Sequence, residues 1–113
     1  MCMEISKETI IRINKGFGGS LRNEASLDFA LQQQENNKLG EYKKLAYLFR
    51  AILVDHVFTD GNKRTAMFLT LAFTNETNKT ANADLLLHHI LSISIKNITQ
   101  IRAIEERLRN AIK

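Results

Sequence analysis

The sequence predicts an all-α fold of about six helices, packed as a compact bundle in a single domain over residues 1–113. Three observations predict it. Apolar residues recur at three-and-four spacing in several segments, proline is absent, and three of the five glycines fall in one short loop. A length of 113 residues fits one domain, and hydrophobic and charged fractions of 44% and 25% are typical of a globular protein with its own core.

The first two helices lie on either side of the glycine-rich loop. The amphipathic helix expected over residues 4–14 carries Ile5, Ile10, Ile11 and Ile13. The KGFGGS segment, residues 15–20, ends this helix as a flexible loop. Ser26, or a residue just before it, caps a second helix that QQQENNKLG ends. Its predicted buried residues are Leu27, Phe29, Ala30 and Leu31.

The middle of the chain is the most apolar part. Residues 41–57 form a helix whose apolar residues have three-and-four spacing, namely Leu45, Leu48, Phe49, Ile52 and Leu53. In the later segment 66–73 only Thr70 is polar. A helix that is apolar nearly all round is buried on all sides, so we expect residues 66–73 to form the central core helix.

The C-terminal third begins with a polar connection, NETNKTANA, over residues 75–83. Residues 85–95 form another apolar segment, for which a strand stays an alternative to a helix. A last amphipathic helix buries Ile98, Ile101, Ile104 and Leu108. Its outer side carries Arg102, Glu105, Glu106, Arg107 and Arg109.

Cysteine content and hydropathy exclude several classes of protein. The single cysteine, Cys2, excludes an intrachain disulfide framework and a cysteine-based zinc site. The N-terminal residues are charged too early for a signal peptide, and no apolar run approaches the roughly 20 residues of a membrane span. We therefore expect a cytoplasmic protein without a membrane partner. The net charge of +4 fits a nucleic-acid surface, an acidic protein partner, a phosphate ligand or a plain solvated surface.

Most of the polar chemistry lies in HVFTDGNKR, His56–Arg64, between two apolar segments. Gly61 relaxes the backbone so that consecutive amides can point the same way at the start of the next helix. A helix N-terminus with free N–H groups is an anion site. Lys63 adds a point charge, Arg64 adds a planar fork, and Asn62 can donate one more hydrogen bond. The pattern predicts a cradle for nucleotide phosphates.

The other residues of the motif suit transfer chemistry. Phosphate would repel Asp60 unless a divalent cation lay between them, and one carboxylate with phosphate oxygens and water is a usual magnesium environment. His56 can take a proton near neutral pH, and Phe58 and Val57 anchor the loop in the core. Together these residues predict phosphoryl or nucleotidyl transfer to a hydroxyl. The alternative is a capped helix start with Asp60 as the N-cap, Gly61 in the turn and both cations solvated.

HVFTDGNKRTA resembles the signature of the Fic/Doc family, His-x-Phe-x-(Asp/Glu)-Gly-Asn-(Gly/Lys)-Arg, at seven fixed positions out of nine. GGSLRNEASLDFAL, residues 18–31, is similar to the segment that small members carry ahead of the core. The resemblance implies a Fic/Doc-like helical bundle that uses magnesium and transfers part of ATP, or of another nucleoside triphosphate, to a hydroxyl of a target protein. It also implies a role for each motif residue: His56 as general base, Phe58 as structural anchor, Asp60 as magnesium ligand, and Gly61, Asn62, Lys63 and Arg64 as nucleotide-binding residues.

Two positions resemble the Doc-type (death-on-curing) toxin branch. AMP-transferring members usually have Gly at the position of Lys63 and a second Arg at the position of Met67. Doc-like members bind the nucleotide the other way round, which implies kinase activity: transfer of the γ-phosphate to a Ser or Thr, with translation elongation factor Tu as the model target. The alternatives are AMPylation or other nucleotidyl transfer, and a degenerate nucleotide-binding regulator. Nucleic-acid binding ranks last, because Glu105 and Glu106 interrupt the C-terminal basic residues.

Three further features concern regulation and metal binding. Family members are often restrained by a glutamate in a Ser/Thr-x-x-x-Glu-Gly/Asn helix, but the nearest string here, SLRNEA (20–25), ends in Ala and is misplaced, so a separate antitoxin is the expected partner. The glycine loop Lys15–Gly19 is either part of a flap that docks the target or a plain connection. His88 and His89 would point about 100° apart on a helix, which predicts a buried or half-buried structural pair.

Overall fold

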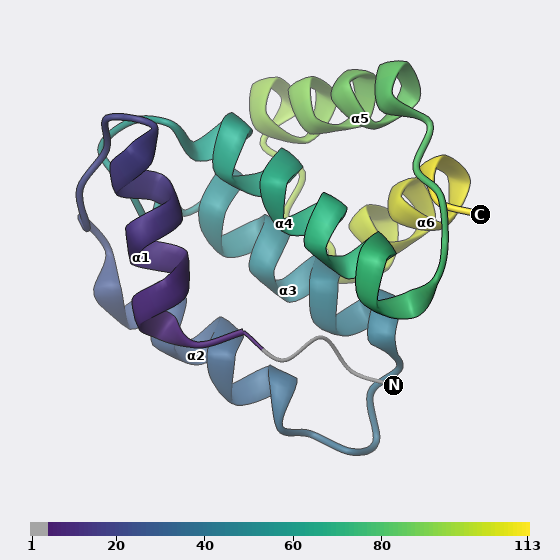
Figure 1. Ribbon diagram of the computed structural model, residues 1–113, viewed down its shortest axis with the longest axis horizontal. Helices are drawn as coiled ribbons and strands as arrows, with labels where there is room; N and C mark the ends of the chain where they lie inside the picture. Colours follow the sequence, from purple (N-terminus) through teal and green to yellow (C-terminus); the bar gives the residue numbers. More distant parts are fainter. Residues whose placement is uncertain (1–4) are drawn as a thin grey trace.

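Six α-helices follow one another in the computed structural model, which describes residues 5–113 (Figure 1). They are α1 (Lys7–Gly16), α2 (Glu24–Gln34), α3 (Glu41–Leu53), α4 (Asn62–Thr77), α5 (Ala83–Lys96) and α6 (Ile101–Ala111). Within the described range the only β-type pairings are two isolated bridges, Leu21–Phe58 and Ala81–Ile112. The predicted all-α fold of about six helices is confirmed. Cys2 lies outside the described residues.

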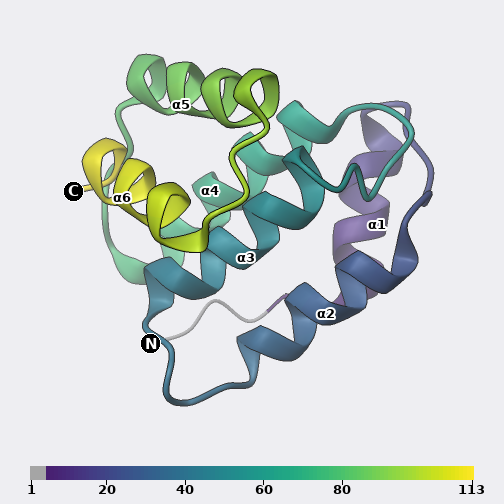
Figure 2. The same cartoon turned by 180° about the vertical axis from the view of Figure 1, so that it is seen from behind.

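α3 is the central helix of the bundle. It packs against α2, α4, α5 and α6. Figures 1 and 2 show it crossing the middle of the molecule, with α4 alongside it on one side and α6 on the other. Its buried residues cover most of the helix, namely Tyr42, Lys44, Leu45, Ala46, Leu48, Phe49, Ala51, Ile52 and Leu53, and one side with Lys43, Tyr47 and Arg50 is half-buried. The positions of these four helices are therefore set by contact with α3, whereas α1 packs against α2 and α4.

α4 is buried on one side only. Leu69 and Phe73 are inside, whereas Phe68 is 45% exposed and Leu71 is 54% exposed. The prediction that residues 66–73 form the central core helix is therefore wrong. A continuous apolar run places apolar side chains on every side of a helix, but it does not say how many of those sides have a neighbour.

Several helix boundaries differ from the predicted ones, including the following three. α1 continues to Gly16 and ends where the Phe17 N–H donates to the carbonyl of Asn14. α3 ends at Leu53, so the last residues of the predicted 41–57 helix belong to a loop. α4 continues to Thr77, into the segment predicted as a polar connection. Helix ends depend on cap hydrogen bonds, which the hydropathy pattern does not encode.

α2 begins at an N-cap upstream of Ser26. The side chain of Asn23 accepts the Ser26 N–H at 3.3 Å, so Ser26 lies in the first turn. Among the predicted buried residues, Leu27 and Ala30 are inside and Leu31 is half-buried. Phe29 is 46% exposed, so its predicted burial is wrong; its ring packs edge-on against Tyr47, with 5.9 Å between the ring centroids.

α5 and α6 complete the bundle beside α3 and α4. The strand alternative for residues 85–95 is excluded, because the segment is helical and buries Leu86, Ile90 and Ile93 at helical spacing. α6 buries Ile104 and Leu108 as predicted, but Ile101 is only half-buried, and Ile98 is half-buried in the connection before the helix. Across residues 5–113, no helix combines the length and the apolar character that a membrane span requires.

The burial of α3 gives a matched test on two isoleucines. Ile52 on α3 is fully buried, whereas Ile95 on α5 is 77% exposed. Ile52→Ala should lower the free energy of unfolding by about 2–5 kcal/mol, since it removes packed methylene groups and leaves a cavity. Ile95→Ala should change it by less than about 0.5 kcal/mol. Urea denaturation followed by circular dichroism measures both values, and equal losses would contradict the central position of α3.

Candidate functional site

The motif loop, residues 54–61, connects α3 to α4. The side chain of Asn62, the first residue of α4, makes hydrogen bonds to the backbone of this loop. The Asn62 side chain accepts the Phe58 N–H at 3.2 Å and donates to the Phe58 carbonyl at 2.9 Å. The rings and methyls of Phe58 and Val57 are buried in the core. The Asn62 amide is thus engaged with the loop, which leaves its backbone N–H as its clearest contribution to an anion site.

α4 begins at a glycine rather than at an aspartate. Its N-cap is Gly61, with φ +72°, and the Asp60 carboxylate accepts the Gly61 N–H at 2.8 Å. The alternative with Asp60 as the N-cap is therefore wrong. The first turn of an α-helix has N–H groups without intrahelical partners, and the positive end of the helix dipole lies there. The exposed side chains of Lys63 and Arg64 add two cations to this turn.

One pocket of about 430 Å³ collects the predicted polar residues. It is lined by His56, Asp60, Gly61, Asn62, Lys63 and Arg64, together with Phe17, Thr59 and Ser94. Phe58, the predicted anchor, is 1% exposed and is not part of the lining. The six motif residues predicted to do chemistry therefore lie around one cavity at the start of α4.

His56 lies in the loop, three residues beyond the end of α3, and not at the end of the helix as the sequence suggested. Its backbone is left-handed, with φ +52°, and its side chain is exposed in the pocket. This conformation costs a residue other than glycine about 1–2 kcal/mol, so neighbouring hydrogen bonds must hold it. Several come from the 20–23 segment, where both Arg22 N–H and Asn23 N–H donate to the Val57 carbonyl, at 2.7 and 3.0 Å.

Asp60 is the carboxylate residue in the lining of the pocket. Its carboxylate is exposed at the pocket and receives one hydrogen bond, from the Gly61 N–H. Within residues 5–113 there is no group of three or more His, Cys, Asp and Glu residues that could hold a metal ion. A magnesium ion at Asp60 would therefore take its other ligands from phosphate oxygens and water, as this ion often does.

The loop is also tied to α1 through Asn14, which is fully buried. The Asn14 amide donates to the Asp60 carbonyl at 2.8 Å and to the Thr65 hydroxyl at 3.1 Å, and that hydroxyl donates to the Gly61 carbonyl at 2.8 Å. Its Oδ1 atom has no hydrogen-bond partner among the described residues. Gly19 lies directly against this group, because a Cβ atom there would come within 2.3 Å of the Asp60 carbonyl oxygen.

Sequence reasoning missed several residues of the site and its support. A polar Asn14 four residues after Ile10, on the apolar side of an amphipathic helix, was a usable signal. Phe17 was inside the glycine loop considered as a flap, and it now lines the pocket. Ser94 comes from α5, and nothing in its local sequence points to the motif; only the packing of α5 beside α4 brings it there.

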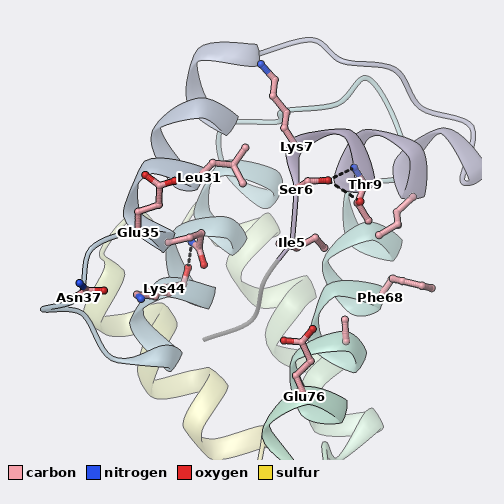
Figure 3. A pocket seen from close by; sticks show the side chains of 13 residues that line it. Ile5, Ser6, Lys7, Thr9, Leu31, Glu35, Asn37, Lys44, Phe68 and Glu76 are labelled. Carbon is pink, nitrogen blue, oxygen red and sulfur yellow. Dashed lines mark hydrogen bonds between the residues drawn. The ribbon is translucent and has the colours of Figure 1, made fainter. Parts of the chain in front are cut away.

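Further cavities lie outside the predicted site. The largest, about 1040 Å³, is bordered by α1, α2, α3 and α4 and contains no residue of the His56–Arg64 motif (Figure 3). A smaller apolar hollow of about 290 Å³ adjoins the pocket and shares Phe17, Lys63 and Arg64 with it. Its other walls are Met67, Phe68, Leu71 and Leu87.

The histidine pair and the glutamate string are engaged elsewhere. His89 is half-buried and its Nε2 lies 2.8 Å from the Asn110 Oδ1, whereas His88 is exposed. His88 therefore departs from the predicted buried or half-buried pair. Glu24 of the SLRNEA string forms an ion pair with Lys7, and Asp28 and Glu24 together raise the pKa of the Lys7 ammonium. Glu24 is thus paired with α1 and not with Arg64.

The helical bundle thus places His56 and the first turn of α4 around one pocket. The Fic/DOC family model matches residues 4–74, more than half of the chain, and this protein belongs to that family. Members of the family are in general transferases that act on proteins with ATP. No curated protein and no solved structure matches the chain.

The contact between Gly19 and the loop predicts different effects for two glycine substitutions. Gly19→Ala should lower the free energy of unfolding by at least about 1–3 kcal/mol, because the new Cβ overlaps the Asp60 carbonyl and the Asn14 side chain. Gly16→Ala, where the Cβ meets nothing within 4 Å, should change it by less than about 1 kcal/mol. Thermal unfolding of both variants tests this prediction. A Gly19→Ala variant as stable as Gly16→Ala would contradict the close contact of Gly19 with Asp60 and Asn14.

Proposed function

We propose that this protein transfers the γ-phosphate of ATP to a Ser or Thr hydroxyl of a target protein, as a Doc-type toxin-like kinase. The observation that carries the proposal is the pocket that brings His56 and Asp60 together with the first turn of α4. A base, a cation ligand and an anion cradle are the three parts that phosphoryl transfer requires. Membership of the Fic/DOC family supports a transferase that acts on proteins.

In the proposed reaction His56 takes the proton of the target hydroxyl. The hydroxyl oxygen then forms a bond to the γ-phosphorus, while the bond from that phosphorus to the bridging oxygen breaks and ADP leaves with the electron pair. The N–H groups of the first α4 turn, with Lys63 and Arg64, stabilise the charge on the phosphate oxygens. Asp60 would hold magnesium, which neutralises phosphate charge when it is bound.

Lys63 and Met67 favour transfer of the γ-phosphate over transfer of AMP. Lys63 borders both the pocket and the adjoining hollow, where a bulky cation takes up space that a glycine would leave free. Met67 lines the apolar hollow and brings no charge to it, in the position where AMP-transferring relatives usually carry a second Arg. Nucleotidyl transfer on the same scaffold stays the second candidate, and a degenerate nucleotide-binding regulator the third.

The proposed partners follow from the same resemblance. The target is a protein similar to translation elongation factor Tu, and the proposed setting is the cytoplasm. A separate antitoxin is the proposed inhibitor, since the glutamate of the SLRNEA string is paired with Lys7. Nucleic acid is not part of the proposal.

A transfer assay with two labels tests the reaction. A lysate from related cells receives the protein, magnesium and ATP labelled at either the γ- or the α-phosphate. We expect label from the γ-phosphate only, on one protein band. His56→Asn should lower the rate about 10²–10⁴-fold while ATP binding persists, because asparagine tolerates the left-handed backbone better than alanine but cannot act as a base.

Each outcome of this assay separates the candidates. Label from the α-phosphate would contradict the kinase activity and support nucleotidyl transfer. A second outcome is that neither label is transferred although the mass of the purified protein shows that no inhibitor is bound. This outcome would support the third candidate, a degenerate nucleotide-binding regulator. Transfer by His56→Asn at the wild-type rate would remove His56 as the base.

Arg64 gives a second prediction, on affinity. Arg64→Ala should weaken ATP binding about tenfold to a hundredfold, since a charge-assisted hydrogen bond is worth about 1.5–3 kcal/mol. Arg102→Ala on α6 is the control, because it removes the same charge from a side chain that is 91% exposed. Isothermal titration with ATP and magnesium measures both, and equal affinities of the two variants would take Arg64 out of the cradle.

A further inference from the structure

Three successive carbonyl groups around the proposed base accept hydrogen bonds from Arg22 and Asn23. Arg22 Nε donates to the His56 carbonyl at 3.2 Å, and its Nη2 reaches the Asp55 carbonyl at 3.4 Å. The Asn23 side chain also donates to the Asp55 carbonyl, at 3.3 Å. The Val57 carbonyl accepts both backbone N–H groups, at 2.7 and 3.0 Å. Two neighbouring residues thus bind the backbone on both sides of His56.

The pairing extends beyond these carbonyls. Leu21 and Phe58 form an antiparallel bridge, and the Thr59 N–H donates to the Ser20 carbonyl at 2.9 Å. In return the Ser20 N–H donates to the Thr59 hydroxyl at 3.1 Å. The 20–23 segment therefore runs beside residues 55–59 as a short extended pair. The left-handed His56 lies within this stretch, where its backbone has few ways to move.

Arg22 differs from the cations of the motif in what it contacts. It is exposed and is not part of the pocket lining, so its guanidinium serves the backbone rather than the phosphate site. Guanidinium is a planar fork of donors, which suits two neighbouring carbonyl oxygens better than an ammonium does. Hydrogen bonds to a charged donor are also stronger than those between neutral groups.

We propose that Arg22 is a positioning residue for His56: it fixes the left-handed backbone at residue 56 and so aims the imidazole into the pocket. This inference rests on the proposed function for its catalytic consequence, but not for its structural content. Asn23 contributes to the same geometry, yet it is also the N-cap of α2. Arg22 makes no cap contact, so its substitution tests positioning without removing the start of a helix.

The test compares Arg22→Ala, Arg22→Lys and the control Arg102→Ala in two measurements on the full chain. In the transfer assay, Arg22→Ala should lower kcat about tenfold to a hundredfold, the effect of a small misplacement of a reacting group, while KM for ATP changes less than about twofold. Arg22→Lys should recover part of kcat, because one ammonium can still reach a carbonyl. Arg102→Ala should match the wild type.

The second measurement needs no activity. Nuclear magnetic resonance of the ATP-free protein should show moved and broadened His56 ring signals in Arg22→Ala. Backbone N–H exchange at residue 22 and at Thr59 should be faster by about tenfold or more, since the pair between the two segments opens more often. Signals are assigned by comparison with His56→Asn.

The two measurements separate failure of the inference from failure of the proposed function. Unchanged ring signals and exchange in Arg22→Ala would overturn the positioning role whatever the activity. So would a kcat within twofold of the wild type in an active enzyme. If the wild-type protein has no transfer activity but Arg22→Ala still moves the His56 signals, the proposed kinase activity is contradicted. The positioning role of Arg22 is then still supported.

Discussion

The hydrogen bond between the buried Asn14 amide and the Asp60 carbonyl joins the first helix to the motif loop. The loop must expose charged side chains and backbone N–H groups, so it cannot be held by burying them. It is held instead through its carbonyls and through its apolar residues. The Asn14 amide and the 20–23 segment donate hydrogen bonds to carbonyls of the loop. The side chains of Phe58 and Val57 are buried in the core. The polar side of the loop stays free to meet a ligand.

The side chains proposed for catalysis and most of the groups that hold them in position come from different parts of the sequence. The side chains proposed for catalysis come from nine consecutive residues, His56–Arg64. Many of the groups that hold them come from α1, from the 20–23 segment and from α3, which lie outside the motif, and Asn62, Val57 and Phe58 add support from within it. α3 supplies a packed support, because most of its surface is buried and the motif loop begins directly after its last residue, Leu53. A mutation in either part can therefore impair the site, through chemistry in one case and through geometry in the other.

The sequence allowed prediction of the helical fold and of the residues around the pocket, because both depend on local patterns. Periodic apolar residues mark helices, and a glycine followed by asparagine and two cations marks an anion-binding helix start. The exposure of Phe29 and of Phe68 could not be predicted, since it depends on which helix sides have neighbours. Ser94 and Arg22 were missed for a related reason: their partners are remote in sequence, and their own neighbourhoods look ordinary.

The order of the chain has a consequence for how the site forms during synthesis. Asn14, Gly19 and the 20–23 segment all precede the loop that they hold, so they have already left the ribosome when the loop emerges. The α3 segment packs against α6, which follows the motif loop in the chain, so this contact can form only after the loop has been made. Contacts distant in sequence form slowly because loop closure costs entropy. The supports of the motif loop are thus made before the loop itself, whereas the contact between α3 and α6 can form only after it.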